Sequence, residues 1–315
     1  MGAGYFIEFP KLGIHLNISP IAFEIPQIGN FGPVSAHWYG IIIATAILIA
    51  LTLCLKQTKN FGIKEDDIVD MFLLALPVAI IFARLFFVVF TWDSYKNDLL
   101  GIFRIWEGGL AIYGAIIGAV LSVYIFTRKR KMDMLNLLDF ACVYLPLAQA
   151  IGRWGNFTNQ ELYGTNTDLP WGMTGNLIQA WPASGVDGSR PVHPTFLYES
   201  VLNVIVFIIL LRLRRNRRVK GGVFASYLML YSFVRFMMEF LRTDEFGAGN
   251  IRYNQVFAAA VFIGALIWLL YLRRHAENKA VQEEVAGPSA YSEIIDELEK
   301  EEQKEAEKEA QPSEQ

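Results

Sequence analysis

Long runs of apolar residues alternate with short polar segments along most of this chain. Seven of these runs approach or exceed the roughly 18 residues with which an α-helix crosses a lipid bilayer. We predict membrane spans at about 38–55, 69–91, 110–127, 134–150, 196–211, 222–241 and 254–272. The pattern therefore predicts an all-α polytopic membrane protein with seven transmembrane helices.

Basic residues gather in alternate loops between these spans. The loops after the first, third, fifth and seventh spans are rich in Lys and Arg, as at 128–131, and the other loops are poor in both. Because Lys- and Arg-rich loops remain in the cytoplasm, we predict that the N-terminus lies outside and the C-terminus inside. An odd number of spans agrees with this orientation.

Composition agrees with a membrane protein. Of the residues, 53% are hydrophobic and only 19% are charged, whereas a soluble domain is near 25% charged. The first span follows neither a basic segment nor a small-residue cleavage site, so we predict no removable signal peptide. Cys54 and Cys142 lie in apolar runs without metal-ligand spacing and are expected to pack in the core.

These patterns divide the chain into three parts. An extracytoplasmic N-terminal segment covers 1–37, and a membrane domain covers 38–272, including an extracytoplasmic loop region at 151–195. A cytoplasmic tail covers 273–315. From Ala276 onward this tail has 13 acidic residues and four lysines, which is typical of a solvated helix or a disordered extension.

Polar residues scattered along the sequence fall on the outer side in this orientation. Tyr231, Arg235 and Glu239 share one face of the sixth span. A charge inside a membrane costs roughly 2.5–3.5 kcal/mol and usually faces a bundle interior or a wet cavity. We therefore predict an outward-facing polar cavity. The other residues expected there are His37, Tyr39, Arg84, Glu107, Tyr113, Arg153, Asn156, Asn159, Glu161, His193, Tyr198, Glu199 and Arg242.

Several of these residues also have a purely structural interpretation. Arg84 would equally well brace a helix, and Glu239 would serve only as the ion-pair partner of Arg235. His193 would only cap the helix that follows it. Asp139 lies near the inner end of the fourth span, away from the other polar residues, and is expected to be structural. Arg153 and its signature neighbours are expected to follow the outer end of that span.

The predicted cavity suits an anionic ligand. Arginine offers a planar fork of donors that matches phosphate, and asparagine adds neutral donors and acceptors. Glycines such as Gly152 and Gly155 allow close backbone approach. The sequence has no P-loop, HExxH, paired-cysteine metal site or GxSxG elbow, which argues against nucleotide hydrolysis, zinc proteolysis and serine hydrolysis. These residues alone do not specify a reaction.

One segment carries a family resemblance. GRWGNFTNQELYG, at 152–164, resembles the signature G-R-x-G-N-F-x-N-x-E-x-x-G of the bacterial prolipoprotein diacylglyceryl transferases. The resemblance covers roughly 31–272 and leaves the acidic tail outside. Other similar segments follow in the same order: HWYG at 37–40, ARLFFVVF at 83–90, EGGLAIYGAIIGA at 107–119, HPTFLYES at 193–200 and YSFVRFMMEFLR at 231–242.

The resemblance implies a specific reaction. Enzymes of this family move the diacylglyceryl group of phosphatidylglycerol to the lipobox cysteine of a preprolipoprotein, which forms a thioether and releases glycerol 1-phosphate. It also implies seven spans in the bacterial cytoplasmic membrane, with a site open to the outer side and to lipid. We expect no metal, no cofactor and no nucleic-acid partner.

The resemblance also implies roles for individual residues. Arg153 is expected to bind the lipid phosphate, and Arg235 is the second key arginine. With Tyr39 and Tyr113 they form the expected catalytic set. The other residues expected to contact phosphatidylglycerol are Arg84, Asn156, Asn159, Glu161, Gly164, His193, Tyr231, Glu239 and Arg242.

Tyr113 departs from the family pattern, because many members have a histidine at this place. A phenol ionises only well above neutral pH, so tyrosine is a poor general base. Either the substrate thiol loses its proton without a histidine, or His37 or His193 assists. We favour the first, since nearby arginines lower the pKa of a thiol.

Two other classes of function use the same features. A transporter or scramblase of an anionic lipid would need similar arginines, but we find no internal repeat, and the polar residues lie on one side rather than at the midplane. A non-catalytic scaffold with the acidic tail as a docking arm leaves the arginines unexplained.

Overall fold

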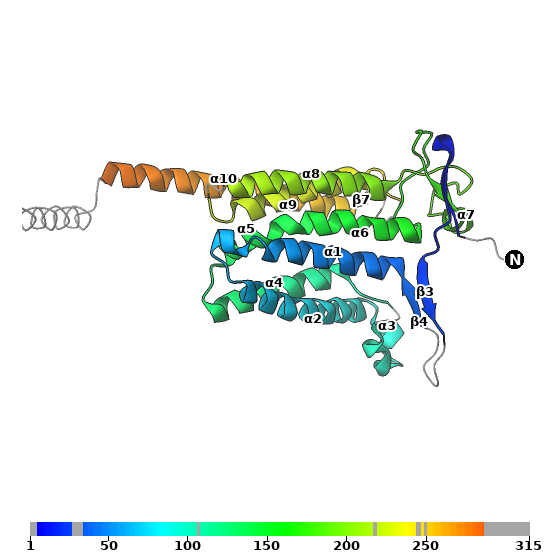
Figure 1. Ribbon diagram of the computed structural model, residues 1–315, viewed down its shortest axis with the longest axis horizontal. Coiled ribbons are helices and arrows are strands. Elements are labelled where there is room, and N and C mark those ends of the chain that lie inside the picture. Colours follow the sequence, from blue (N-terminus) through cyan, green and yellow to red (C-terminus); the bar gives the residue numbers. More distant parts are fainter. Residues whose placement is uncertain are drawn as a thin grey trace, which may run out of the picture.

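The computed structural model describes residues 5–26, 34–105, 108–216, 219–243, 247–248 and 251–286. Glu107 and the tail beyond 286, for which predictions were made, lie outside this part. Long helices form a bundle, and short strands and loops cover one of its ends (Figure 1). The long helices are α1 (Trp38–Leu55), α2 (Glu65–Phe90), α4 (Ile112–Arg130), α5 (Met134–Ala141), α6 (Leu145–Asn159), α8 (Thr195–Arg215), α9 (Gly222–Glu239) and α10 (Tyr253–Ala286).

Six helical segments of the described chain are long and apolar enough to cross a membrane. They are α1, α2, α4, the run 134–159 that α5 and α6 share with the short 3-10 helix η5 (Cys142–Tyr144), α8, and the first 26 residues of α10. The predicted sixth span, 222–241, forms α9, which is not among these six. Arg235 and Glu239 lower the hydropathy of α9, although the helix packs against both α8 and α10.

The signature segment is helical for longer than predicted. The expected span at 134–150 continues through α6 to Asn159, where Gln160 adopts a left-handed conformation (φ 52°) and ends the helix. Arg153, Asn156 and Asn159 therefore lie on the last turns of α6, and the prediction that they follow the helix was wrong. The apolar run ends early because these positions carry polar side chains, although the helical backbone continues.

A hydrophobic cluster fills the end of the bundle that lies opposite the short strands (Figure 1). Cys54, Ile68, Leu137, Phe140 and Tyr144 are buried there and join α1, α2, α5 and η5. Cys142 is also buried, and both cysteines are free, as predicted. Asp139 is buried at the same end. Its carboxylate accepts hydrogen bonds from two backbone N–H groups at the start of α9, which confirms the structural role predicted for it.

α2 and α4 form a closely packed pair. A Cβ atom at Gly114 or Gly118 would clash with the backbone of α2, so these glycines let the two helices approach. At the end of the pair away from the short strands, Arg130 of α4 pairs with Asp70 of α2 at 2.5 Å and with Asp67 at 3.6 Å.

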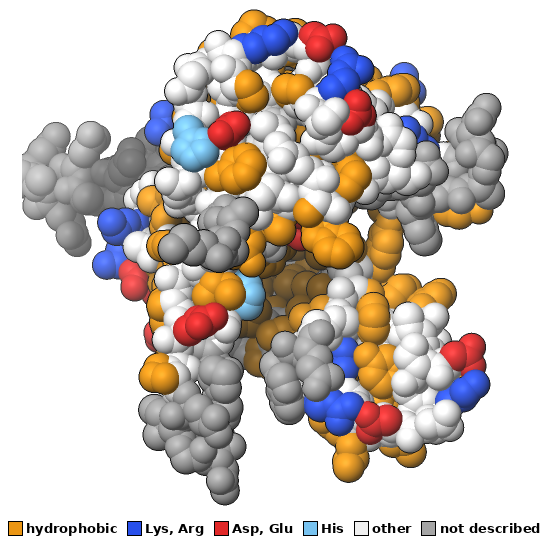
Figure 2. Space-filling view, turned by 90° about the vertical axis from the view of Figure 1, so that its right-hand side faces the viewer, with side chains coloured by type: hydrophobic (Ala, Val, Ile, Leu, Met, Phe, Trp, Pro, Cys, Tyr) orange, Lys and Arg blue, Asp and Glu red, His pale blue; other side chains and the backbone are white. Residues whose placement is uncertain are grey.

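Short elements cover the opposite end of the bundle (Figure 1). β1 (Ile7–Phe9) pairs antiparallel with β2 (Ile14–Leu16) and with β5 (Thr174–Gly175). β3 (Ile21–Ile25) pairs with β4 (Val34–His37), which runs directly into α1. Seen from this end, the molecule is hollowed, and hydrophobic side chains line the hollow (Figure 2). The remaining short elements are α3 (Trp92–Tyr95), α7 (Asn176–Ala180), η1 (Pro10–Leu12), η2 (Thr58–Phe61), η3 (Leu99–Phe103), β6 (Gly247–Ala248) and β7 (Ile251–Arg252).

A second hydrophobic cluster fixes this cap to the helices. Ile7 of β1, Phe157 of α6 and Phe196 of α8 are buried together with Met173 and Val192 from the loop between α6 and α8. The cluster therefore holds the last turn of α6 against the first turn of α8. That junction is where most of the predicted site residues lie.

Candidate active site

One buried carboxylate joins three segments at this junction. Glu199, in the second turn of α8, is 2% exposed. It forms an ion pair with Arg153 of α6 and lies 3.4 Å from Nη1 of Arg242, which follows α9 and is itself buried. Sequence analysis expected Glu199 in the polar cavity but gave it no catalytic or lipid-binding role. The signal was available, because a glutamate inside an apolar helix rarely lacks a partner.

The signature side chains continue this network toward the loop after α6. Nη1 of Arg153 donates to Oδ1 of Asn156 at 3.4 Å, and Nδ2 of Asn156 donates to Oε1 of Glu161 at 2.8 Å. Asn159 donates to the same carboxylate oxygen at 3.4 Å. Its own Oδ1 is buried and accepts no hydrogen bond in the described part of the chain. The predicted residues of this segment therefore form one connected polar group.

Tyr39 lies against this group. A Cβ atom at Gly155 would come within 2.8 Å of the Tyr39 ring, so the signature glycine lets the ring rest on α6. The Tyr39 hydroxyl interacts electrostatically with Glu161 and Arg153. The ring is 38% exposed at the start of α1. The structure thus brings the predicted tyrosine to the predicted arginine.

Gly164 allows three segments to meet. Its N–H donates to the carbonyl of His193 at 2.9 Å, and it forms a β-bridge with Arg242. A Cβ atom here would lie 2.8 Å from both the His193 side chain and the Leu241 carbonyl. Any larger residue would push the end of α9 away from the loop that precedes α8.

His193 precedes α8 and contacts its first turn. Its carbonyl accepts from the N–H of Thr195 at 2.9 Å, but the N-cap of α8 is Pro194, and the His193 side chain makes no capping hydrogen bond. Its Nδ1 lies 3.2 Å from the hydroxyl of Tyr198. Burial lowers the pKa of the imidazole, so the neutral form prevails near pH 7.

Stability should depend on pH through His193. Since the unfolded chain binds the proton more readily than the fold does, stability is expected to fall as pH drops below the ordinary histidine pKa of about 6.5. In H193Q, the decrease in Tm between about pH 7.5 and about pH 5.5 is expected to be smaller than in the parent protein. H275Q, at an exposed position of α10, is the control, and equal pH dependence in all three proteins would contradict this expectation.

A second cluster lies between α4, α9 and α10. Tyr113, Tyr231 and Arg235 line a pocket of about 160 Å³. The hydroxyl of Tyr113 donates to Oδ1 of Asn254 at 3.1 Å. Nη2 of Arg235 lies 3.0 Å from the fully buried carboxylate of Glu239, whereas its Nη1 makes no hydrogen bond within the described residues. Arg235 therefore lines this pocket with an unused donor.

Arg84 lies apart from both clusters. Its guanidinium donates five hydrogen bonds, of 2.7–3.3 Å, to carbonyls between Gly101 and Gly109, and it lies 5.2 Å from the ring centre of Tyr95. These contacts match the bracing interpretation, because they fix the connection between α2 and α4. In the described chain, no group of three or more His, Cys, Asp or Glu side chains is arranged to hold a metal ion.

The sequence of the chain matches known proteins. A family model described as prolipoprotein diacylglyceryl transferase matches residues 26–271. This chain belongs to the prolipoprotein diacylglyceryl transferase family. The matched range contains both clusters and leaves the acidic tail outside, as the sequence resemblance indicated.

Curated relatives in this family share about two-fifths of their residues with the chain. It is 42% identical over 246 residues to the phosphatidylglycerol–prolipoprotein diacylglyceryl transferase of Clostridioides difficile. The aligned region covers 78% of this chain and 94% of that protein. The enzyme of the same name from Listeria innocua is 42% identical over 258 residues, or 81% and 90% of the two chains. That of Ligilactobacillus salivarius is 42% identical over 259 residues, or 81% and 94%. The family recognised from the signature is therefore confirmed.

Proposed function

We propose that this chain transfers the diacylglyceryl group of phosphatidylglycerol to the lipobox cysteine of preprolipoproteins. The product is a thioether, and glycerol 1-phosphate leaves. One observation carries the proposal: in a chain of this family, Arg153, Asn156 and Glu161 of the signature meet Tyr39 and Glu199 at one end of an apolar bundle. That end presents cationic and neutral donors beside an apolar hollow, which suits a phosphodiester headgroup with acyl chains.

In the proposed topology the protein is a multi-pass protein of the bacterial cytoplasmic membrane, with the N-terminus outside and the C-terminus inside. α9 is the sixth of seven spans. Its membrane cost is offset because Arg235 and Glu239 pair with each other at 3.0 Å and their side chains are 20% and 0% exposed. The basic loops then lie inside, and both clusters face outward.

This topology predicts which loops a reagent reaches from outside. The natural cysteines are buried, so an introduced cysteine at an exposed loop position should dominate labelling. In intact cells, a membrane-impermeant maleimide is expected to label S184C, in the loop between α6 and α8, but not K59C, in the loop after α1. K59C should react after lysis. Labelling of K59C alone in intact cells would contradict the orientation.

In the proposed mechanism, each guanidinium is held by one buried carboxylate and offers its remaining donors to the lipid phosphate. Glu199 orients Arg153, and Glu239 orients Arg235. The substrate thiolate attacks the glyceryl carbon bonded to the phosphate oxygen, that C–O bond breaks, and its electron pair leaves with glycerol phosphate. The arginines stabilise the charge that develops there. The enzyme thus contributes mainly positioning and electrostatics.

Proton removal is proposed to need no protein base. Tyr113 is a poor candidate for the base, because its phenol hydroxyl donates its hydrogen to Asn254. A thiol beside two guanidinium groups is ionised to a greater extent than in water. The proton lost from the thiol balances the extra charge of the phosphate monoester that is released.

The test is a transfer assay with purified protein in micelles that contain phosphatidylglycerol. A synthetic lipobox peptide is expected to gain the mass of one diacylglyceryl group, and a peptide with serine in place of the cysteine is not. Release of glycerol phosphate should match the mass gain. Binding of phosphatidylglycerol without any transfer would instead support a transporter or scramblase of an anionic lipid.

A further inference from the structure

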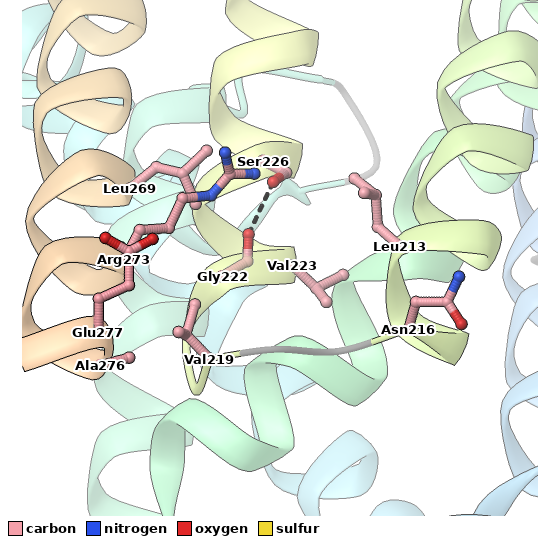
Figure 3. A pocket seen from close by; sticks show the side chains of 10 residues that line it. All are labelled: Leu213, Asn216, Val219, Gly222, Val223, Ser226, Leu269, Arg273, Ala276 and Glu277. Atoms are coloured by element: carbon pink, nitrogen blue, oxygen red, sulfur yellow. Dashed lines mark hydrogen bonds between the residues drawn. The ribbon is translucent and has the colours of Figure 1, made fainter. Parts of the chain in front are cut away.

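A groove at the other end of the bundle has no part in the proposed reaction. It has a volume of about 580 Å³ and lies between the last turn of α8, the first turns of α9 and the middle of α10 (Figure 3). Leu213 and Asn216 line it from α8, and Leu269 and Arg273 line it from α10 on the opposite side. Its volume falls in the range of small-molecule sites in proteins.

The walls of the groove are apolar, and its amide and charged side chains are Asn216 at the end of α8 and Arg273 and Glu277 in the middle of α10. Leu213, Val223 and Leu269 contribute hydrocarbon from three different helices. Ser226 also lines the groove. Its hydroxyl donates to the carbonyl of Gly222 at 2.7 Å, so it offers no donor to a ligand (Figure 3). This division suits an amphipathic molecule with a polar head.

In the part of the chain that the structure describes, three polar side chains at the groove have no protein partner. Within the described residues, no hydrogen bond or ion pair engages the side chains of Asn216, Arg273 or Glu277. By contrast, Lys220 nearby pairs with Asp133 at 3.0 Å. A guanidinium that is not neutralised beside apolar walls attracts phosphate, which accepts several of its hydrogen bonds at once.

We propose that this groove binds a glycerophospholipid, with the phosphodiester on Arg273 and an acyl chain along Leu213, Val223 and Leu269. Glu277, one turn further along α10, accepts hydrogen bonds from headgroup hydroxyl or ammonium groups. Under the proposed orientation the lipid belongs to the inner leaflet, where basic pockets between transmembrane helices bind lipid headgroups. The inference uses that orientation but not the transfer reaction.

Native mass spectrometry of the full chain, titrated in detergent with dioleoylphosphatidylglycerol, tests this site. Binding at the groove is expected to weaken about tenfold or more in R273A, because a hydrogen bond to a charged group is lost. A276W, which fills the groove and keeps Arg273, should lose the same lipid. R274A removes the neighbouring exposed arginine, which does not line the groove, and should bind as the parent protein does.

Three controls separate the possible outcomes. Dioleoylglycerol, which lacks the phosphate, should not be retained at the groove, and inorganic phosphate should not displace the phospholipid. Transfer to a lipobox peptide should remain at the parental rate in R273A and A276W, so this site and the active site can fail independently. Equal binding in R273A and R274A, unchanged binding in A276W, or displacement by inorganic phosphate alone would overturn the assignment.

Discussion

R153A and R235A are each expected to lower kcat for diacylglyceryl transfer by about 10²- to 10³-fold, the usual cost of removing a donor that stabilises developing charge. Arg153 reaches the signature network from α6, and Arg235 lines the pocket beside α4 and α10 and has a buried Nη1 without a partner among the described residues. Both therefore have donors suited to the phosphate that leaves. The measurement is the rate of thioether formation on a lipobox peptide by mass spectrometry.

Matched variants separate the loss of charge from the loss of geometry. R153K keeps a positive charge but lacks the planar fork, so its activity is expected to lie between those of the parent protein and R153A. R190A removes an exposed arginine of the loop between α6 and α8, which pairs only with exposed Asp168 among the described residues, and should leave transfer unchanged. Near-parental turnover in both R153A and R235A would refute the proposed mechanism.

Replacing Glu199 is expected to affect stability and activity together. E199Q leaves Arg153 and Arg242 without their shared carboxylate, and removing one member of a buried ion pair costs about 3–5 kcal/mol. Because Arg153 then loses its orientation, kcat should also fall. Tm and kcat are measured on the same detergent-purified samples. E24Q, at an exposed position of β3, should change neither.

A double variant distinguishes positioning from simple stabilisation. E199Q with R242M restores the balance of buried charge, so its Tm is expected to recover part of the loss seen in E199Q. Transfer should not recover, since Arg153 still lacks its carboxylate. Full recovery of kcat together with Tm would mean that Glu199 acts only through stability.

The two clusters contain the same kind of ion pair. In each, a carboxylate that is almost fully buried holds a partly exposed arginine: Glu199 holds Arg153, and Glu239 holds Arg235. A buried carboxylate limits the rotamers of its partner and lets a guanidinium remain in an apolar setting. The remaining donors of each guanidinium are then available to a phosphate without reorganisation.

The bundle could be predicted from the sequence because hydropathy is a local property. The predicted span 38–55 matches α1, and each other predicted apolar run overlaps a helix. The predicted end of a helix was wrong where polar residues occupy the helical surface, as on the last turns of α6. The family was also a sequence result, since the signature at 152–164 is contiguous and its match required no knowledge of folding.

The roles of individual charges depended on the tertiary structure. Arg84 donates to carbonyls 17 to 25 residues away. Glu199 pairs with Arg242 across 43 residues and with Arg153 from another helix. An arginine in an apolar helix needs a hydrogen-bonding or ionic partner, and the hydropathy pattern shows where such an arginine lies. The identity of the partner depends on which segments the fold brings close to it. The sequence therefore determined the helices and the family, and packing decided which arginines remain available to a ligand.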